Sequence, residues 1–451
     1  MRLHPATLQS LARDLTEGRT TSRALVEECL EQIGRADGQG AAAFTFVDAE
    51  AARLAADAMD KLRAARAEPS PYAGVPVSVK DLFDVRGQVT RAGSRVLENE
   101  PPAERDATIV ARLRQAGFVI IGRTNMTEFA YSGLGINPHY GTPLNPWDRQ
   151  GKRIPGGSSS GAAISVTDGM AHGAIGTDTG GSCRIPAAFT GIVGYKPTAA
   201  RVPKDGCVPL STTLDSIGPL ARTVDCCAIL DTVLSGQTHS MRDRNIRALR
   251  FLVPETLVFD GIDATVATDF ERAVKRLADA GATIVRAPMQ ELKDVAAINS
   301  RGGFSAAESW TWHWPHIDRG AELYDPRVLV RISRGAELTA ADYIELGQAR
   351  ARVIEAVEAR LADFDALMLP TVPIVAPRLA ELERDEDYSR INILVLRNPS
   401  LINLIDGCAM SLPMHEPGSA PTGLMLAGTR GSDSRIFEVA RAVEGVLSAG
   451  R

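Results

Sequence analysis

The chain has 451 residues, and its 50 basic and 55 acidic side chains leave a net charge of −5. This length is enough for a large hydrophobic core, and the charge balance gives no electrostatic reason to expect a nucleic acid or an anionic membrane as a partner. No apolar run approaches the roughly 18 residues of a membrane span, and the N-terminus lacks the apolar core of a signal peptide. We therefore expect a cytoplasmic globular protein.

The six cysteines and seven histidines are scattered along the chain. No Cys-x-x-Cys pair is present, so we expect buried free thiols in a reducing compartment, and neither a disulfide framework nor a zinc site. His313 and His316 have the spacing of neighbours on a helix, but no carboxylate-rich pattern surrounds them. We predict no metal and no cofactor.

The first third of the chain changes from helical patterning to strand-like patterning. Residues 1–66 form a predicted helical segment packed on the core, with a start signal at Thr20-Thr21-Ser22 and alanine-rich sequence over 41–66. Residues 67–451 form the predicted α/β domain. Gly74–Asp81 alternates like a strand and carries Lys80 at its end; a helix at 106–117 and a buried strand at 118–122 follow.

The rest of the chain continues this alternation of strands and helices. A Gly-, Pro- and Asn-rich loop is predicted over 133–155, a strand over 171–177, and a short helix after it. Residues 210–224 are expected to enter another helix. The remaining predicted strands are 249–253, 283–286, 365–370, 411–414 and 423–428, and the remaining predicted helical regions are 264–280, 288–360 and 434–447. Without a repeat or a clear linker, this order favours one large α/β domain with a parallel or mixed sheet.

The stretch from 156 to 198 contains two glycine–serine turns, Gly156–Gly161 and Gly180–Ser182, on either side of a segment of small residues. Small residues allow the backbone to approach a ligand closely and expose its N–H groups. A serine becomes a nucleophile when a neighbouring base takes its proton. The strand and helix that flank the second turn argue against a flexible linker.

Three chemistries compete for these serines. Residues 157–161 match the Gly-x-Ser-x-Gly nucleophile elbow around Ser159, but Lys152–Pro155 stands where that elbow needs an apolar strand. A phosphate-binding loop is the second possibility, but no Gly-x-x-x-x-Gly-Lys-Ser/Thr or Gly-x-Gly-x-x-Gly motif follows a strand. In the third interpretation Ser182 is the nucleophile and Lys80 is the base, since burial at a strand end would lower the pKa of the amine. A solvated surface lysine is the alternative for Lys80.

The run GGSSSG…GTDTGGSCRIPAAFTGIVGYKPT resembles the signature region of the amidase signature family. That family includes bacterial amidases, fatty-acid amide hydrolase, allophanate hydrolase and the A subunit of the tRNA-dependent amidotransferase. Further similar blocks extend the resemblance over nearly the whole chain: Gly74–Asp81, Ala116–Phe129, Asn145–Trp147, Leu214–Val224 and Leu369–Thr371. The resemblance implies a single large domain whose central mixed, mostly parallel twisted sheet is covered by helices on both faces.

The resemblance also implies a catalytic triad of two serines and a lysine. In it Ser182 is the nucleophile, Lys80 is the base, and Ser158, held after a cis peptide bond, relays the proton between them. The implied oxyanion hole consists of the backbone N–H groups of Thr179, Gly180, Gly181 and Ser182. Each such donor contributes roughly 3–4 kcal/mol to the transition state. No histidine is required, because a neutral lysine can take the proton and a hydroxyl can both donate and accept.

The sequence departs from the family pattern at two positions beside the triad. Ser160 stands where a glycine is common, and Cys183 stands where a branched apolar residue is frequent. We expect both departures to leave activity intact, with Ser160 affecting how its loop packs.

The residues that contact substrate vary in this family, so the resemblance identifies them less firmly than the triad. Tyr131 is expected near the acyl pocket, and Ser159 is a second candidate contact. Arg331 lies in a block similar to one where the A subunit of the amidotransferase binds a substrate carboxylate; a surface helix arginine is the alternative. The tryptophans Trp310, Trp312 and Trp314 either wall the pocket or pack in a core or interface.

We predict a stand-alone amidase that hydrolyses a small carboxamide or urea-like amide to the acid and ammonia or an amine. The A subunit of the amidotransferase is one alternative. However, residues 297–325 lack a Tyr-Asp-Gly segment, and the net negative charge does not indicate a tRNA-binding surface. A catalytically silent binding subunit is another, against which the intact Lys80, Ser158 and Ser182 argue. We leave open whether the chain forms a homodimer.

Overall fold

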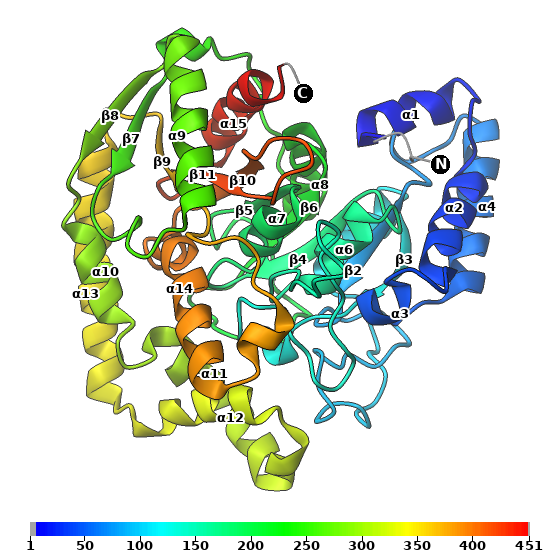
Figure 1. Ribbon diagram of the computed structural model, residues 1–451. Helices are drawn as coiled ribbons and strands as arrows, with labels where there is room; N and C mark the ends of the chain where they lie inside the picture. Colours follow the sequence, from blue (N-terminus) through cyan, green and yellow to red (C-terminus); the bar gives the residue numbers. More distant parts are fainter. Residues whose placement is uncertain (1–5, 450–451) are drawn as a thin grey trace.

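A sheet of 11 strands crosses the molecule in the computed structural model, which describes residues 6–449 (Figure 1). The first five residues of the predicted 1–66 segment and the last two of the predicted 67–451 domain lie outside the described residues. The chain folds as a single α/β domain around this sheet, as the sequence predicted.

The regular elements alternate along the whole described chain. The strands are β1 (Phe44–Phe46), β2 (Pro76–Lys80), β3 (Val119–Thr124), β4 (Ala174–Asp178), β5 (Val193–Lys196), β6 (Ser216–Ala221), β7 (Arg250–Pro254), β8 (Thr283–Ala287), β9 (Ala366–Pro370), β10 (Cys408–Pro413) and β11 (Gly423–Gly428). The α-helices are α1 (Leu8–Thr16), α2 (Ser22–Gly34), α3 (Gly40–Ala43), α4 (Ala49–Ala64), α5 (Thr108–Gln115), α6 (Ser160–Thr167), α7 (Arg184–Thr190), α8 (Val224–Ser235), α9 (Ala264–Asp279), α10 (Glu291–Ile298), α11 (Gly303–Gly320), α12 (Pro326–Ser333), α13 (Ala340–Leu361), α14 (Asp385–Leu404) and α15 (Asp433–Ser448).

The strand order is β1-β3-β2-β4-β6-β5-β10-β11-β9-β7-β8. Parallel pairing is confined to β3-β2-β4 and to β9-β7-β8, and all other neighbours are antiparallel. The prediction of a mixed sheet is confirmed, but the prediction that it is mostly parallel is wrong. The antiparallel centre arises because β5 and β6 are joined without a crossover helix, as are β10 and β11, and antiparallel neighbours need no such crossover.

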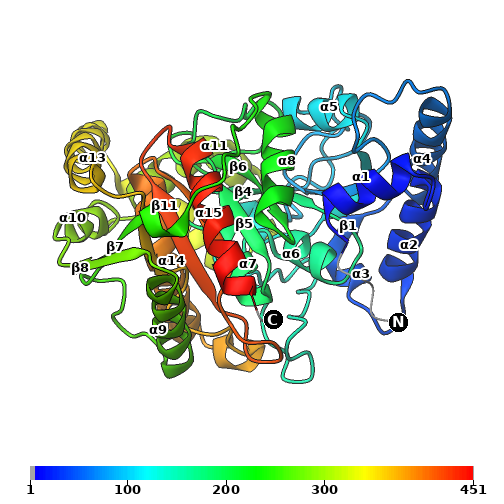
Figure 2. The ribbon, with the colours of Figure 1, turned by 90° about the horizontal axis from the view of Figure 1, so that it is seen from above.

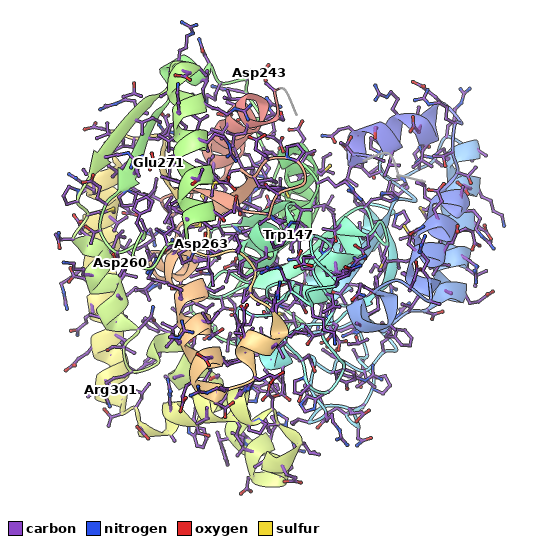
Figure 3. The ribbon with its side chains drawn as sticks, in the orientation of Figure 1. Trp147, Asp243, Asp260, Asp263, Glu271 and Arg301 are labelled. Carbon is purple, nitrogen blue, oxygen red and sulfur yellow. The ribbon has the colours of Figure 1, made fainter. Side chains whose placement is uncertain are left out.

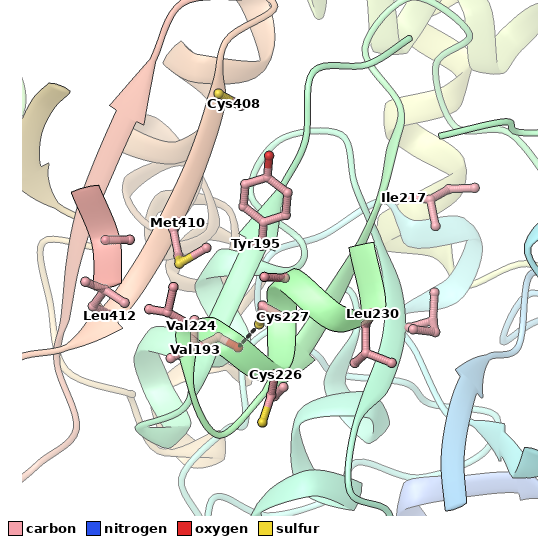
Figure 4. Close-up of a cluster of buried hydrophobic side chains, with 14 of the residues drawn as sticks. Val193, Tyr195, Ile217, Val224, Cys226, Cys227, Leu230, Cys408, Met410 and Leu412 are labelled. Atoms are coloured by element: carbon pink, nitrogen blue, oxygen red, sulfur yellow. Dashed lines mark hydrogen bonds between the residues drawn. The ribbon is translucent and has the colours of Figure 1, made fainter. Parts of the chain in front are cut away.

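Helices pack on both faces of the sheet, because successive side chains of a strand point to opposite faces and each face is apolar. On β9, Met368 joins a core that includes residues of α8 and α15, whereas Leu367 and Leu369 join a core with α10, α13 and α14. Figure 4 shows part of the first core, where Cys227 of α8 contacts Val193 of β5. Each fully buried side chain of this kind contributes about 1.5–3 kcal/mol.

The N-terminal segment lies at one end of the sheet, where α2 and α4 lie side by side (Figure 2). Helix α2 begins as the sequence indicated, because the Thr21 side chain accepts the N–H of Ala24. The segment is not purely helical, since β1 pairs antiparallel with β3 and forms the edge of the sheet.

The run over 210–224 enters helix α8 as expected, but the sequence did not predict the strand within the run, because Ser216–Ala221 forms β6. Gly218 and Pro219 disfavour a helix there, and all six residues are buried between β4 and β5. Helix α8 begins only after Thr223, whose side chain accepts the N–H of Cys226.

The predicted loop over 133–155 contains no regular element, but its side chains fix it to the domain. Asn145 donates its amide to the carbonyl oxygen of Phe189 at 2.7 Å. The guanidinium of Arg153 lies over the ring of Trp147, 4.5 Å from its centroid (Trp147 is labelled in Figure 3). The glycine–serine turn that follows therefore starts from an anchored chain.

We predict that Gly218→Ala destabilises the protein by about 1–3 kcal/mol, because the new methyl group overpacks the sheet centre. A Cβ at Gly218 would lie 2.0 Å from the carbonyl oxygen of Tyr195 on β5, and that backbone cannot give way easily. Thermal unfolding of the purified variant should show a lower midpoint. Gly347→Ala is the control: it lies exposed on α13 with no atom within 4 Å of the new Cβ, and its midpoint should not fall. Equal midpoints for both variants would contradict this account of the sheet.

Candidate active site

The carboxyl ends of three neighbouring parallel strands, β3, β2 and β4, meet at one edge of the sheet. Lys80 is the last residue of β2, and Asp178 is the last residue of β4. In open α/β sheets ligands bind outside such strand ends. The second glycine–serine turn follows β4 directly, so the topology brings it close to the lysine.

Lys80 is fully buried, and its amine contacts only hydroxyl groups at hydrogen-bond distance. Its Nζ donates to Ser158 Oγ at 2.7 Å and to Thr177 Oγ1 at 2.8 Å. Among the described residues no carboxylate forms an ion pair with it. Burial, which disfavours the charged form, lowers the pKa of Lys80 to about 8. The amine is therefore available as a base near neutral pH.

The Ser158 hydroxyl is held beside Lys80 by the backbone around it. The Gly157–Ser158 peptide bond is cis. The Gly157 N–H donates to the carbonyl oxygen of Gly133 at 2.8 Å, and the Ser158 carbonyl accepts the N–H of Thr127 at 3.1 Å. Ser158 itself is fully buried. Its hydroxyl is thus held at hydrogen-bond distance from the lysine amine.

Ser182 lies in that turn, just before α7, and lines a pocket. Its carbonyl oxygen accepts the N–H of Ser159 at 3.3 Å, so the two glycine–serine turns are in direct contact. Only 3% of Ser182 is exposed. The structure therefore brings Lys80 and Ser158 into hydrogen-bonding contact and sets Ser182 in the adjoining turn, at the pocket wall.

The turn that carries Ser182 wraps around the buried carboxylate of Asp178. Arg184 donates to both oxygens of this carboxylate, at 2.8 and 3.0 Å, and the Asn403 amide donates at 2.9 Å. The backbone N–H groups of Gly181 and Cys183 donate at 2.8 and 3.1 Å. Burial alone would raise the pKa of Asp178, but the Arg184 guanidinium and its hydrogen bonds hold that pKa well below its usual range.

Three of the four residues predicted to supply oxyanion donors line the pocket. Thr179, Gly180 and Ser182 line it, and their backbone N–H groups have no acceptor among the described residues. Gly181 differs from the expectation, because its N–H is already bonded to Asp178 and the residue does not line the pocket. A donor that satisfies a buried carboxylate is not available to a substrate oxygen.

The pocket at Ser182 has a volume of about 480 Å³ and a distinctive charge. Arg331, Arg334 and Arg397 are among its lining residues, and no aspartate or glutamate is. Arg397 donates to the carbonyl oxygens of Val258 and Asp260, which directs its guanidinium to that loop. Arg331 and Arg334 therefore give the pocket wall a positive charge.

Two of the three predicted substrate contacts line this pocket. Arg331 donates to the carbonyl oxygen of Tyr131 at 2.6 Å, so the structure brings these two residues together. Burial raises the pKa of Tyr131 to about 12, and its phenol remains protonated. Ser159 does not line the pocket: its Oγ donates to the carbonyl oxygen of Thr177 at 3.4 Å, and α6 follows it without a preceding strand. The nucleophile-elbow interpretation of Ser159 therefore lacks its structural context.

The tryptophan cluster lies beside a different pocket. Trp310 and Trp312 line a space of about 580 Å³ next to Glu308 and Tyr343, whereas Trp314 is 54% exposed. His313, on the same helix, is buried against the hydroxyl of Tyr324. Within residues 6–449 no group of His, Cys, Asp or Glu side chains is arranged to hold a metal ion.

Comparison with known proteins identifies the family. The family model described as Amidase matches residues 24–437. The chain is 38% identical to 2-amino-5-chloromuconic acid deaminase of Comamonas testosteroni, over 95% of this chain and 94% of that protein. It is 33% identical to the A subunit of the glutamyl-tRNA(Gln) amidotransferase of Lacticaseibacillus paracasei, over 97% and 96% of the two chains. A solved structure described as the crystal structure of amidase superposes with a TM-score of 0.89, at 31% identity over 98% and 99%.

The protein belongs to the amidase signature family. As a member of this family it is an amide hydrolase. Among the described residues of this amidase, no helix combines the length and the apolar character that crossing a bilayer requires.

Helix α14 of this amidase contributes to the site in a way that its sequence did not predict. This helix supplies Asn392 to the pocket and Asn403 to the Asp178 network. Three acidic residues in its first turn, Asp385–Asp387, are a helix-start signal that could have revealed it. Pro399 in its interior obscured the pattern, because proline normally interrupts a helix.

We predict that Lys80→Met is more stable than the wild type at pH 7, by about 1 kcal/mol, and that the wild type is the more stable protein at pH 10. The native pKa of Lys80 lies near 8, below the 10.5 of an exposed lysine, so the unfolded state binds more protons between these values. Wild-type stability therefore rises with pH in this window. The shifted pKa is equivalent to roughly 3 kcal/mol, from which roughly 1 kcal/mol is subtracted for each of the two lost hydrogen bonds.

Thermal unfolding midpoints measured from pH 7 to pH 10 test this prediction. Lys275→Met, at an exposed lysine paired with Asp279, is the matched control and should show no such reversal with pH. A difference between Lys80→Met and wild type that stays constant with pH would show that the buried amine does not titrate in this range.

Proposed function

We propose that the protein is a stand-alone amidase that hydrolyses a small carboxamide or urea-like amide through an acyl-enzyme on Ser182. The observation that supports it most strongly is the fully buried Lys80, whose Nζ lies 2.7 Å from Ser158 Oγ with no carboxylate partner among the described residues. A buried amine of lowered pKa next to a hydroxyl is the arrangement expected of a general base. In this proposal the catalytic residues are Lys80, Ser158 and Ser182.

In the proposed mechanism, the neutral Lys80 amine takes the proton of Ser158 while Ser158 takes the proton of Ser182. The Ser182 oxygen then attacks the amide carbon, and the N–H groups of Thr179, Gly180 and Ser182 stabilise the oxyanion of the tetrahedral intermediate. The C–N bond breaks as the proton returns through Ser158 to the leaving nitrogen, which departs as ammonia or an amine. Water is activated by the same route and releases the acid from Ser182.

The pocket favours a small substrate, and Tyr131 and Arg331 are the proposed substrate contacts. A volume of about 480 Å³ lies at the lower part of the range for small-molecule sites. The relative from Comamonas testosteroni is named for an acid, which agrees with the arginines at this pocket. We retain a cytoplasmic location as part of this proposal.

The similarity to the A subunits of amidotransferases supports a second candidate, a glutaminase that works in a complex with partner subunits. A hydrolysis screen of the purified chain separates the two. Release of ammonia or amine from simple amides, ureas or aryl amides without any partner supports the stand-alone amidase, whereas turnover of glutamine only in the presence of partner subunits supports the second candidate.

Labelling with a serine-directed fluorophosphonate should modify Ser182, which lines the pocket, and not Ser159, which does not. Peptide mapping by mass spectrometry locates the adduct. Ser182→Ala should abolish labelling, while Ser159→Ala should retain the adduct on Ser182. An adduct on Ser159 in the wild type would contradict the proposal, and failure of any serine to react, with no turnover in the screen, would favour a silent binding protein.

Lys80→Arg should lose at least about 1,000-fold in kcat/KM, because a guanidinium does not release its proton at working pH and cannot serve as the base. Its circular dichroism spectrum and its titration with a competitive inhibitor report whether the fold and the pocket survive. Lys196→Arg is an informative comparison: Lys196 is also fully buried but donates only to the carbonyls of Pro197 and Gly407. Wild-type turnover in Lys80→Arg would exclude lysine as the base.

A further inference from the structure

Asp215 is a buried carboxylate beside the oxyanion turn, residues 179–182, and the proposed mechanism gives it no role. It stands directly before β6 and is only 6% exposed. We propose that Asp215 is a positioning residue of the reaction: it binds the side-chain hydroxyl of Thr179 and thereby fixes the residue that supplies the first N–H of the oxyanion hole. This inference deepens the proposed function and rests on it.

The sheet places Thr179 and Asp215 opposite each other. Strands β4 and β6 pair antiparallel, and their last paired residues at this edge are Asp178 and Ser216. Thr179 and Asp215 come next beyond this pair, one on each strand, and are therefore cross-strand neighbours. The Thr179 hydroxyl donates to Asp215 Oδ1 at 2.5 Å, a length typical of a hydrogen bond to a charged acceptor. Thr179 itself is buried and lines the pocket beside Ser182.

The second oxygen of the Asp215 carboxylate is bound by a loop. Oδ2 accepts the backbone N–H groups of Leu210 and Ser211, both at 3.0 Å. Since a backbone N–H can only donate, these bonds hold Oδ2 at the loop while Oδ1 meets Thr179. All three donors thus meet a group that accepts at both oxygens, as a carboxylate does and an amide does not. Asp215 therefore connects the loop over 210–215 to the oxyanion turn.

The loop over 210–215 is also held by the carboxylate of Glu308 on α11. The hydroxyls of Ser211 and Thr213 donate to this carboxylate, and so does the N–H of Thr213, at 3.1 Å. The hydroxyl of Tyr343, on α13, donates to it at 2.6 Å. The loop is therefore a firm support for the carboxylate that binds the oxyanion turn.

The surroundings of Asp215 leave it ionised at the pH where Lys80 loses its proton. Burial raises the pKa of Asp215 to about 6, although the Thr179 hydroxyl and the two backbone N–H groups stabilise the charged form. The positive charge of Lys204, whose Nζ donates to the Asp215 backbone carbonyl at 3.3 Å, also stabilises it. The pKa of Lys80 lies near 8. At mildly alkaline pH, Asp215 is therefore a charged acceptor while Lys80 is available as a base.

The hydrogen bond from Thr179 to Asp215 acts on the donor geometry of the oxyanion turn. An oxyanion hole stabilises the transition state when its donors are held in place before the reaction. A hydroxyl bound by a carboxylate fixes the side-chain rotamer of Thr179, and the rotamer is coupled to the backbone that carries it. Loss of this bond should therefore slow bond formation at Ser182 without weakening the binding of a ligand.

The rate at which a fluorophosphonate modifies Ser182 measures this effect without a known substrate. The Ser182 oxygen bonds to phosphorus, fluoride leaves, and the proton passes through Ser158 to Lys80, while the phosphoryl oxygen gains negative charge in the oxyanion hole. Thr179→Val keeps the shape of the side chain but removes the hydroxyl. It should lower the maximal labelling rate by at least about fivefold, with the half-saturating concentration unchanged. Thr179→Ser retains the hydroxyl and should remain within about twofold of the wild type.

A double-variant cycle tests whether Asp215 acts through Thr179. Asp215→Asn keeps an oxygen for the two backbone N–H groups but replaces the acceptor of the Thr179 hydroxyl by a donor, and should lower the maximal rate by at least about threefold. Added to Thr179→Val, it should change the rate by less than about twofold, because the bond is already absent. Thr213→Val is the matched control: it removes a threonine hydroxyl from a carboxylate at the same loop, away from the oxyanion turn, and should leave the rate unchanged.

Three results would overturn the inference: a wild-type rate in Thr179→Val, additive losses in the double variant, or an equal loss in Thr213→Val. The second would mean that Asp215 acts by another route, and the third that any bond at this loop has the same structural effect. If circular dichroism shows that Thr179→Val does not fold, Asp215→Asn and Thr213→Val decide the same question: a loss in the first alone supports the inference, and equal rates reject it. Failure of the proposed function looks different, because no serine then reacts in the wild type, and the inference fails with it.

Discussion

The lysine amine at the end of β2 is buried without a counter-ion among the described residues, and the chemistry of the site depends on this constraint. Moving an ammonium group from water into a protein interior costs several kcal/mol unless the negative charge of a nearby carboxylate offsets this cost. At Lys80 the nearest hydrogen-bond partners are the hydroxyls of Ser158 and Thr177, which accept from the amine without neutralising a positive charge. Burial therefore shifts the equilibrium toward the neutral amine and lowers the pKa of Lys80 to about 8. The same burial that makes Lys80 a base also costs stability.

A second buried network shapes the site without taking part in the chemistry. The carboxylate of Asp178 accepts hydrogen bonds from the guanidinium of Arg184, the amide of Asn403 and two backbone N–H groups of the turn at Ser182. Both charges of this ion pair are fully buried, so removing one partner would leave an uncompensated charge. The network fixes the backbone of the turn, whose residues Thr179, Gly180 and Ser182 line the pocket. Lys80 and Asp178 thus differ in the effect of burial: without a counter-ion the pKa of Lys80 is lowered, whereas the charge of Asp178 is retained by its partners.

The sequence predicted the elements whose pattern is local. The alternation of Gly74–Asp81 ending at Lys80 and the start signal at Thr21 depend on neighbouring residues, and the structure contains both elements. The resemblance to the amidase signature family identified the family correctly. The triad roles of Lys80, Ser158 and Ser182 remain predictions, and the structure adds that Lys80 and Ser158 are hydrogen-bonded.

The features that the sequence did not predict depend on contacts between distant segments. Strand β6 has the glycine and proline of a loop, and only its pairing with β4 and β5 makes it a strand. The Gly181 N–H was predicted to be an oxyanion donor like those of its neighbours. Only the position of the Asp178 carboxylate shows that this N–H is already hydrogen-bonded. Asn392 is separated from Ser132 by 260 residues of sequence, so no local pattern could have joined them.

The pKa of Lys80 in the resting enzyme is the quantity that tests this account most directly. Carbon-13 NMR of the lysine Cε groups, with Lys80→Met to assign the signal, follows its titration without substrate. The account predicts a midpoint near 8, well below the roughly 10.4 of a free lysine, so that a substantial fraction of the amine is neutral at mildly alkaline pH. A midpoint at about 10 or above, close to that of a free lysine, would mean that Lys80 carries its proton in the working enzyme, and the proposed role of Lys80 as the base would then be untenable.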